Sequence, residues 1–379
     1  MKTKRRNSIT LAAALACCCS SVAWAEAPLD GDLYPLWGDN GSGTVHLDFG
    51  MKAIFVDAVK LPGGKALLIG IKEGGGIAMA KLTAGGAPDH SFGGTGYVTL
   101  EPPLSIPQIN THFTPTTATL DLAGNLLIGG FYASENSPND WDFGVCRISV
   151  NTGATITFDG GAASCAGAPI TVENSPEQRN VPFEIFVEPD GKIILIGTVG
   201  GFNGNGSGGA ARLLPNGTVD YSYADSGRKI FRGANYGHLN LYGAARQPDG
   251  RIVYTGMTDK GGVVGRLNAL GQPEPLNNGG EWLISVPVSP RGVALSPKQD
   301  ILVTGQDVNG TSLVVKMPGA NPTMLDADFN NSKGYLDLKK PMDAGMLSSI
   351  VAYGTSGFFV SGIKPDTVYA LAVAPTGKM

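Results

Sequence analysis

Short apolar runs that end at glycine recur along the chain. Their length and their content of Ile, Leu and Val are typical of buried strands. Clear copies occupy residues 64–70, 124–130, 191–197 and 250–256, and weaker copies occupy residues 300–305 and 357–362. The turn before two of the runs is Pro-Asp-Gly followed by a basic residue, at 189–192 and 248–251. Because Asp-Gly tolerates the positive φ of a two-residue turn, it predicts tight antiparallel hairpins.

Two further markers recur in the same order as these runs. A large apolar or aromatic residue precedes a glycine and a short strand at Trp37, Phe92, Tyr223, Leu276 and Phe329, and Phe158 begins a degenerate copy. A basic residue within an apolar strand recurs at Lys81, Arg147, Arg212, Arg266 and Lys316. The constant order indicates internal repeats. We divide the chain into six of them, at about residues 26–88, 89–156, 157–219, 220–275, 276–325 and 326–379.

Each repeat is interpreted as four antiparallel strands, which in the second repeat cover residues 97–100, 116–122, 125–131 and 143–150. No amphipathic helical period separates the strands, so a parallel α/β sheet is excluded. The predicted fold is an all-β, six-bladed β-propeller of four-stranded antiparallel blades with about 59 residues per repeat. We expect each blade to coincide with one repeat, its first strand to be innermost, and the two chain ends to lie side by side.

Three motifs link the repeats to a known family. They are an Asp-x-x-Phe-Gly turn at residues 89–93, a Pro-Asp-Gly-Lys hairpin at 189–192 and an Arg-bearing strand at 212–217. In this combination the chain resembles the bacterial delta-60 repeat family, over essentially all of the sequence after residue 25. Copies three, five and six depart from the pattern. The resemblance implies a propeller-like repeat architecture, common in exported proteins, and it implies no catalytic residues.

The first 25 residues have the organisation of a secretory signal peptide. A basic segment precedes the apolar residues 9–19, and Ala23-Trp24-Ala25 supplies the small residues of a cleavage site. We therefore expect export to the periplasm or the extracellular space, with lipoprotein processing at Cys17 as the alternative. Residues 1–25 contain four basic and no acidic residues, so their removal changes the net charge from −4 to −8. This charge argues against a nucleic-acid partner, and the absence of 18 consecutive apolar residues argues against a transmembrane helix.

Export also affects the interpretation of the five cysteines. Three of them leave with the signal peptide, and Cys146 and Cys165 remain. In an oxidising compartment this pair predicts a disulfide, and two separate buried thiols are the alternative. The bridge would link the fourth strand of the second blade to the elongated connection that follows it.

Two segments carry candidate chemistry, and each has a structural alternative. Residues 326–337 partly resemble a calcium loop, but the sixth position is Asn331 where such a loop requires glycine. The same residues form the repeat's own Asp-x-x-Phe turn. His46 and Asp337 occupy matching places in the first strands of repeats one and six, so they are candidates for a shared site at the channel mouth. Thr99 and Thr171 at the same place in other repeats favour a simple polar lining.

Strand order also predicts where ligands bind. The links between the first and second strands and between the third and fourth strands should emerge on one face of the ring, which we call the long-loop face. It collects the long insertions at 101–116, 133–142, 173–180, 199–209, 232–240 and 339–346. Long loops in repeat proteins often mark the binding face. The candidate binding residues in or beside these loops are His112, Glu135, Asp140, Trp141, Tyr236 and His238.

The sequence favours binding over catalysis. We expect an exported, non-enzymatic binding or scaffold module that contacts a protein or a glycan through the long-loop face, with no cofactor and no metal. The alternative is a propeller hydrolase or lyase with a site at the channel mouth near His46 and Asp337. The fold alone does not decide between the two.

Overall fold

The computed structural model describes residues 53–73, 75–101, 111–134, 137–159, 163–172, 178–201, 206–232, 235–276, 281–320, 322–338, 346–353, 357–364 and 367–373. Within this part of the chain, strands that follow one another in sequence pair antiparallel to form successive sheets. We call the first five sheets blades 1 to 5, in chain order.

The strand bounds of the first three blades are as follows. Blade 1 contains β1 (Ala53–Lys60), β2 (Ala66–Lys72), β3 (Ile77–Leu82) and β4 (Tyr97–Leu100), with a short 3-10 helix, η3 (Pro62–Gly64), between β1 and β2. Blade 2 contains β5 (Thr111–Leu120), β6 (Leu126–Ser134), β7 (Ser137–Ile148) and β8 (Cys165–Ala168), and the short β9 (Gln178–Arg179) pairs in parallel with β7. Blade 3 contains β10 (Val181–Val187), β11 (Ile193–Val199), β12 (Ser207–Leu213) and β13 (Arg228–Phe231).

The remaining sheets complete the described part of the chain. Blade 4 contains β14 (Asn240–Arg246), β15 (Ile252–Thr258), β16 (Gly261–Leu267) and β17 (Glu281–Leu283). Blade 5 contains β18 (Ser289–Leu295), β19 (Ile301–Gln306), β20 (Ser312–Met317) and β21 (Tyr335–Asp337). The last sheet contains β22 (Met346–Tyr353), β23 (Gly357–Lys364) and β24 (Thr367–Val373).

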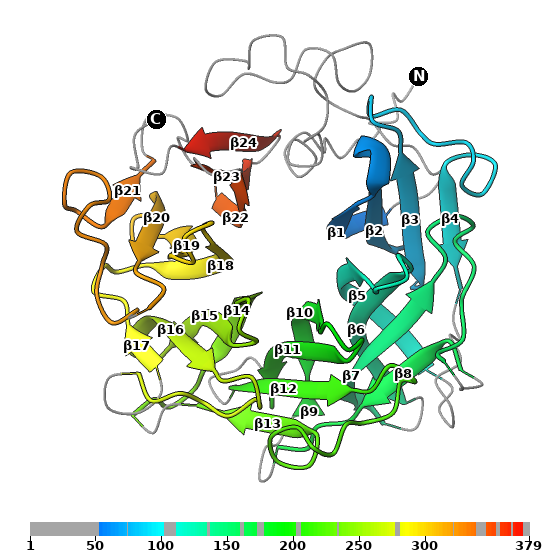
Figure 1. The fold of residues 1–379 in the computed structure, drawn as a ribbon, viewed down its shortest axis with the longest axis horizontal. Helices are drawn as coiled ribbons and strands as arrows, with labels where there is room; N and C mark the ends of the chain where they lie inside the picture. The colour runs from blue at the N-terminus through cyan, green and yellow to red at the C-terminus, as the bar shows by residue number, and fades with distance from the viewer. Residues whose placement is uncertain are drawn as a thin grey trace, which may run out of the picture.

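The sheets are arranged around a central axis, as in a β-propeller (Figure 1). The first strand of each sheet lies nearest the axis and contacts the first strand of the next sheet, in the order β1, β5, β10, β14, β18 and β22. In the described residues, no helix is long and apolar enough to cross a membrane.

The prediction of six four-stranded blades is wrong. Among the described residues four blades have four strands, blade 2 has β9 as a fifth strand, and the last sheet, β22–β24, has three. The blades are also offset from the sequence repeats by one strand. For example, Tyr97 of β4 pairs with Ala80 of β3 and so belongs to the preceding blade. The expectation that the chain ends lie side by side falls on residues 1–52 and 374–379, outside the described residues.

The offset has its cause in hydrogen bonds around the recurring basic residue. The backbone N–H of Arg212 donates to the carbonyl of Gly227, and its carbonyl accepts from the N–H of Asp220, at 3.0 and 2.9 Å. Lys81 makes the same two bonds, with Gly96 and Asp89. Both ends of the Asp-x-x-Phe/Tyr turn are therefore held against the third strand. The strand that leaves the turn must pair with this third strand and becomes the outermost strand of the same blade.

Side chains reinforce this arrangement. Arg212 Nε lies 2.9 Å from Asp220 Oδ2, and its guanidinium lies 4.5 Å from the centre of the Tyr223 ring. Lys81 and Lys316 lie over Phe92 and Phe329 in the same way, at 5.9 and 5.8 Å. Since both basic and acidic groups are largely buried, each is stabilised only while its partner is in place. The aromatic and basic markers of the sequence are thus parts of one contact.

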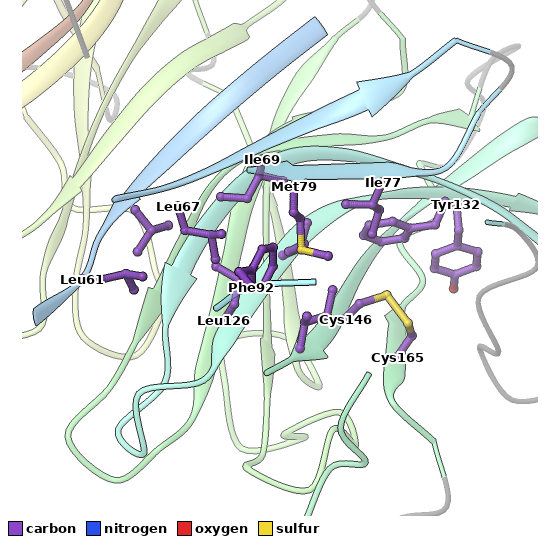
Figure 2. Packing of buried hydrophobic residues seen from close by; sticks show 14 residues of the cluster. Leu61, Leu67, Ile69, Ile77, Met79, Phe92, Leu126, Tyr132, Cys146 and Cys165 are labelled. Atoms are coloured by element: carbon purple, nitrogen blue, oxygen red, sulfur yellow. A yellow bond between two sulfur atoms is a disulfide. The ribbon is translucent and has the colours of Figure 1, made fainter. Parts of the chain in front are cut away.

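A disulfide crosses the outer part of blade 2. Cys146 of β7 and Cys165 of β8 face each other in register, are bonded through their sulfur atoms and have Cα atoms 4.0 Å apart. Figure 2 shows the bridge within the apolar layer between blades 1 and 2, which includes Met79 and Phe92. Both cysteines belong to blade 2 because β8 is the outermost strand of that blade, whereas the sequence placed Cys165 in a connection between blades.

The glycine that ends each apolar run lies opposite a β-bulge of the innermost strand. Gly197 pairs with Pro182 just before the register shift, and Gly70 pairs with Phe55 in the same way. The matching glycines of the other sheets are Gly130, Gly256, Gly305 and Gly362. A Cβ on Gly70, Gly130, Gly197, Gly256 or Gly305 would lie within 2.5 Å of a backbone carbonyl oxygen of the innermost strand. The recurring glycine therefore provides the space that the bulge requires.

A substitution at this position tests the steric explanation. We expect Gly197→Ala to lower the free energy of unfolding by about 2–3 kcal/mol, since the new methyl group meets the Val181 carbonyl and neither backbone can move freely. The measurement is urea unfolding followed by circular dichroism. Gly85→Ala, at an exposed position where a Cβ meets nothing within 4 Å, is the matched control. Equal effects of the two substitutions would contradict the explanation.

Candidate functional site

Two carboxylates lie on innermost strands, directly after the bulges. Asp57 follows the bulge of β1 and Glu184 follows the bulge of β10. Asp57 Oδ2 accepts a hydrogen bond from the backbone N–H of Ala118, in the neighbouring β5, at 2.7 Å. Its Oδ1 accepts from the N–H of Ala58 at the same distance. Glu184 accepts from the N–H of Ala244 in β14. Each carboxylate thus connects its own blade to the next.

The surroundings of these groups shift their protonation. Burial raises the pKa of Asp57 to about 6, against the opposing effect of its hydrogen bonds. Burial also raises the pKa of Glu184 to about 8, and the negative charge of Asp57 adds to this rise. At neutral pH, Glu184 is therefore mostly protonated while Asp57 is mostly ionised. One carboxyl that can donate a proton and one that can accept a proton are the minimum for acid–base chemistry.

Sequence reasoning missed this pair, although a signal was present. Each carboxylate interrupts an apolar strand and lies at the same spacing before the glycine of its apolar run, Asp57 before Gly70 and Glu184 before Gly197. Aligning the repeats on that glycine would have shown that this position carries acidic side chains in two of them.

On the long-loop face, blade 2 brings several of the predicted residues together. His112, Ala133 and Trp141 are in register across β5, β6 and β7. The Trp141 ring stacks on Phe131, with ring centres 4.4 Å apart, and the Arg179 guanidinium lies 5.3 Å from the Trp141 ring centre. Trp141 is half-buried, and Asp140 beside it is exposed. His112 lies in β5, and Glu135 lies outside the described residues.

A second group lies between blades 3 and 4. Tyr236 and His238 are half-buried in the link from β13 to β14. The Lys260 ammonium lies 5.6 Å from the Tyr236 ring centre, and the Gly237 N–H donates to Asp259 at 2.8 Å. Burial, together with the charges of Glu281 and Asp259, raises the pKa of Tyr236. This tyrosine therefore stays a neutral hydrogen-bonding group at physiological pH.

Backbone hydrogen bonds join the two groups across three blades. The carbonyl of Trp141 accepts from the N–H of Asn180, and the carbonyl of Arg179 accepts from the N–H of Gly201. On the next link, the Leu239 N–H donates to the Gly206 carbonyl at 2.8 Å. These contacts form a strip of backbone from β7 of blade 2 to the start of blade 4, on the described residues to either side of 202–205. Trp141 and Tyr236 therefore lie on the same face of the ring.

The proposed pairing of His46 with Asp337 does not agree with the strand order. It required the first strand of each repeat to be innermost, but Asp337 lies in β21, the outermost strand of blade 5, where it pairs with Leu313. The offset between blades and repeats is the reason. His46 lies outside the described residues.

The segment with partial calcium-loop character forms the repeat's own turn. Asp326 lies 2.7 Å from the Lys316 ammonium and accepts from the N–H of Asp328. Within the described ranges, no three His, Cys, Asp or Glu side chains are placed to share a metal ion.

Comparison with known families supports the repeat architecture. A family model described as a domain of unknown function (DUF5122) beta-propeller matches residues 188–223. This segment runs from the Asp-Gly hairpin of blade 3 to Tyr223, within the turn that follows β12, so the match supports a propeller repeat family over a single repeat. The more specific resemblance to the delta-60 family stays a prediction. No curated protein matches the chain.

Solved structures with the same kind of fold include enzymes. The PQQ-bound aldose sugar dehydrogenase from Streptomyces coelicolor superposes with a TM-score of 0.50 at 15% identity, covering 84% of this chain and 93% of that chain. Virginiamycin B lyase from Staphylococcus aureus superposes with a TM-score of 0.46 at 14% identity, covering 84% of both chains. At such low identity the likeness extends to the fold alone, a β-propeller.

Proposed function

We propose that the protein is an exported, non-enzymatic β-propeller that binds a protein or a glycan through its long-loop face. The observation that carries this proposal is the strip of backbone hydrogen bonds from Trp141 to Leu239, which joins aromatic and charged side chains of three blades. A surface held rigid over three blades suits an extended ligand, because little conformational entropy is lost when the ligand binds.

The side chains along this strip are of the types that contribute most at interfaces. Trp, Tyr and Arg are enriched among the residues that dominate binding energy. The Trp141 ring is held in place by contacts with Phe131 and Arg179, and it stays half-buried, so part of it is accessible to a ligand. Exposed Asp140 and Asn235 flank the two groups and provide polar contacts at the rim.

The face that binds can be identified by crosslinking and by charge reversal. We expect a photoreactive amino acid at Asp140 or Asn235 to give crosslinked products with envelope proteins or glycans, and one at exposed Asp249 on the opposite face to give none. Asp140→Arg combined with Asn235→Arg should then weaken binding of the identified ligand roughly tenfold or more.

The control is Asp249→Arg, which alters an equally exposed side chain of the opposite face. Thermal unfolding of each variant shows whether the fold is kept. Crosslinking that is confined to position 249, or that is as strong at position 249 as at positions 140 and 235, would contradict the proposal.

A second candidate function is acid–base catalysis at the ring centre. The raised pKa values of Asp57 and Glu184 favour it, because enzymes shift the pKa of carboxyl groups in this direction when they use them as proton donors. This site at the ring centre replaces the channel-mouth site that the sequence predicted at His46 and Asp337. If the protein only binds a ligand, Asp57 and Glu184 serve to connect neighbouring blades.

The shifted protonation predicts a particular pH dependence of stability. Glu184 stays protonated in the folded chain up to pH about 8 but ionises near pH 4.3 when unfolded. Its contribution to stability is therefore present below about pH 4 and is lost as the pH rises towards 8. We expect Glu184→Gln to flatten the pH dependence of the free energy of unfolding between pH 5 and 8, by at most about 1.4 kcal/mol per pH unit.

Urea unfolding at several pH values checks this prediction, with Asp249→Asn as the control. Since Arg251 lowers the pKa of Asp249, this group does not titrate between pH 5 and 8. If Glu184→Gln leaves the slope of the free energy of unfolding against pH unchanged, the Glu184 carboxyl titrates normally in the folded chain.

A screen with glycoside, ester and lyase substrates separates the two functions. Turnover that is lost in both Asp57→Asn and Glu184→Gln supports catalysis. Turnover that both variants retain excludes a catalytic site at the ring centre.

A further inference from the structure

A pocket of about 230 Å³ lies between blades 2 and 3, on the face opposite the long-loop face. We call this opposite face the hairpin face, because the turns at 121–125, 188–192 and 247–251 emerge there. Leu127, Phe158, Ile193 and Pro215 supply apolar lining. The charged lining consists of Asp121, Asp159, Asp190 and Arg147. The pocket therefore combines an apolar floor with a mostly acidic mouth.

The irregular turn of blade 2 creates this mouth. In blade 3, the residue whose N–H donates to the carbonyl of Arg212 is Asp220, and its carboxylate pairs with the same arginine. In blade 2, Ile156 makes the corresponding backbone bond to Arg147. The acid comes three residues later, at Asp159, whose Oδ1 lies 2.7 Å from Arg147 Nη1.

This change moves the carboxylate from the interior to the surface. The Asp159 side chain is 72% exposed, whereas that of Asp220 is 7% exposed. Phe158 nevertheless stays buried and packs against Gly217 of blade 3, as Tyr223 packs against Gly271 of blade 4. The blade thus keeps its packing while its acidic group stands at the rim of a pocket.

The charges at the mouth favour a cation. Arg147 is held by Asp121 at 2.7 Å and by Asp159, so its positive charge is engaged inside the wall. Asp190 is 55% exposed and lies 2.9 Å from Lys192. Together the three carboxylates exceed the two basic groups by one charge. The groups most open to solvent at the mouth are the carboxylates of Asp159 and Asp190.

We propose that this pocket receives the side chain of a lysine from a polypeptide partner. The alkyl stem of lysine would lie on the apolar floor, and its ammonium would lie between Asp159 and Asp190, in the manner of long cationic side chains at apolar surfaces. Pockets for whole small molecules usually have about 300–1,000 Å³, so this one suits a single side chain. Leu122, 67% exposed at the rim, offers an apolar contact to neighbouring residues of the partner. The proposal is independent of ligand binding at the long-loop face.

The test is an NMR titration of the isotope-labelled protein with acetyl-Ala-Ala-Lys-Ala-Ala-amide. We expect shifts of the backbone amides of Ala123, Asp159 and Gly191, and an affinity roughly two- to fivefold weaker for the analogue with norleucine in place of lysine. Asp159→Asn and Asp190→Asn should each weaken the binding of the lysine peptide by a similar factor. Both side chains are exposed, and Arg147 keeps its ion pair with Asp121, so we expect the fold to be kept; thermal unfolding verifies this.

The chain contains its own matched control. The Pro-Asp-Gly turn of residues 189–191 recurs at 248–250, so Asp249→Asn removes an equivalent charge away from the pocket and should leave the affinity unchanged. The proposal is overturned if the lysine peptide does not shift these amides, if norleucine binds equally well, or if Asp249→Asn weakens binding as much as Asp190→Asn does. Butylammonium binding as tightly as the peptide would instead identify a site for free amines and overturn the polypeptide partner.

Discussion

The contacts around the buried basic residue of each blade determine the architecture. The backbone of Arg212 holds both ends of the turn from Asp220 to Gly227, and its side chain is enclosed by a carboxylate and an aromatic ring. A buried cation is stable only with such partners, so the turn cannot leave the strand that carries it. The strand after the turn is therefore added to the outside of the same blade. Which strand faces the axis follows from this placement.

The innermost strands show the consequence. Because the strand after the Asp-x-x-Phe/Tyr turn lies outside, the next strand along the chain lies at the axis and carries a bulge opposite a glycine. The residue after the bulge is then directed to the neighbouring blade, where Asp57 and Glu184 accept backbone hydrogen bonds. The same geometry that closes the gaps between blades thus partly buries two carboxyl groups and raises their pKa values.

Departures from the repeat are concentrated in blade 2, and each has a structural consequence. Its β6–β7 hairpin is extended and carries Trp141, to which β9 is added in parallel. Its outer strand is fixed by the Cys146–Cys165 disulfide. Its Asp-x-x-Phe turn is replaced by one that leaves Asp159 at the surface. A repeat protein can vary one blade in this way because neighbouring blades interact mainly through their packed faces.

Local pattern in the sequence determined the all-β class, the hairpins, the order of markers and the two cysteines that pair. These depend on contacts between residues close in the chain, such as the turn at Pro189-Asp190-Gly191 and the apolar run that follows it. The tertiary structure alone decided which blade each strand joins, that the last sheet of the described chain has three strands, and that Asp57 and Glu184 meet the backbone of a neighbouring blade. Judged by local propensity alone, the strand after the turn could pair equally well with the strand before it, in the same blade, or with the strand after it, in the next blade. The backbone hydrogen bonds of Arg212 and its buried contact with Asp220 and Tyr223, made across the turn, distinguish the two pairings.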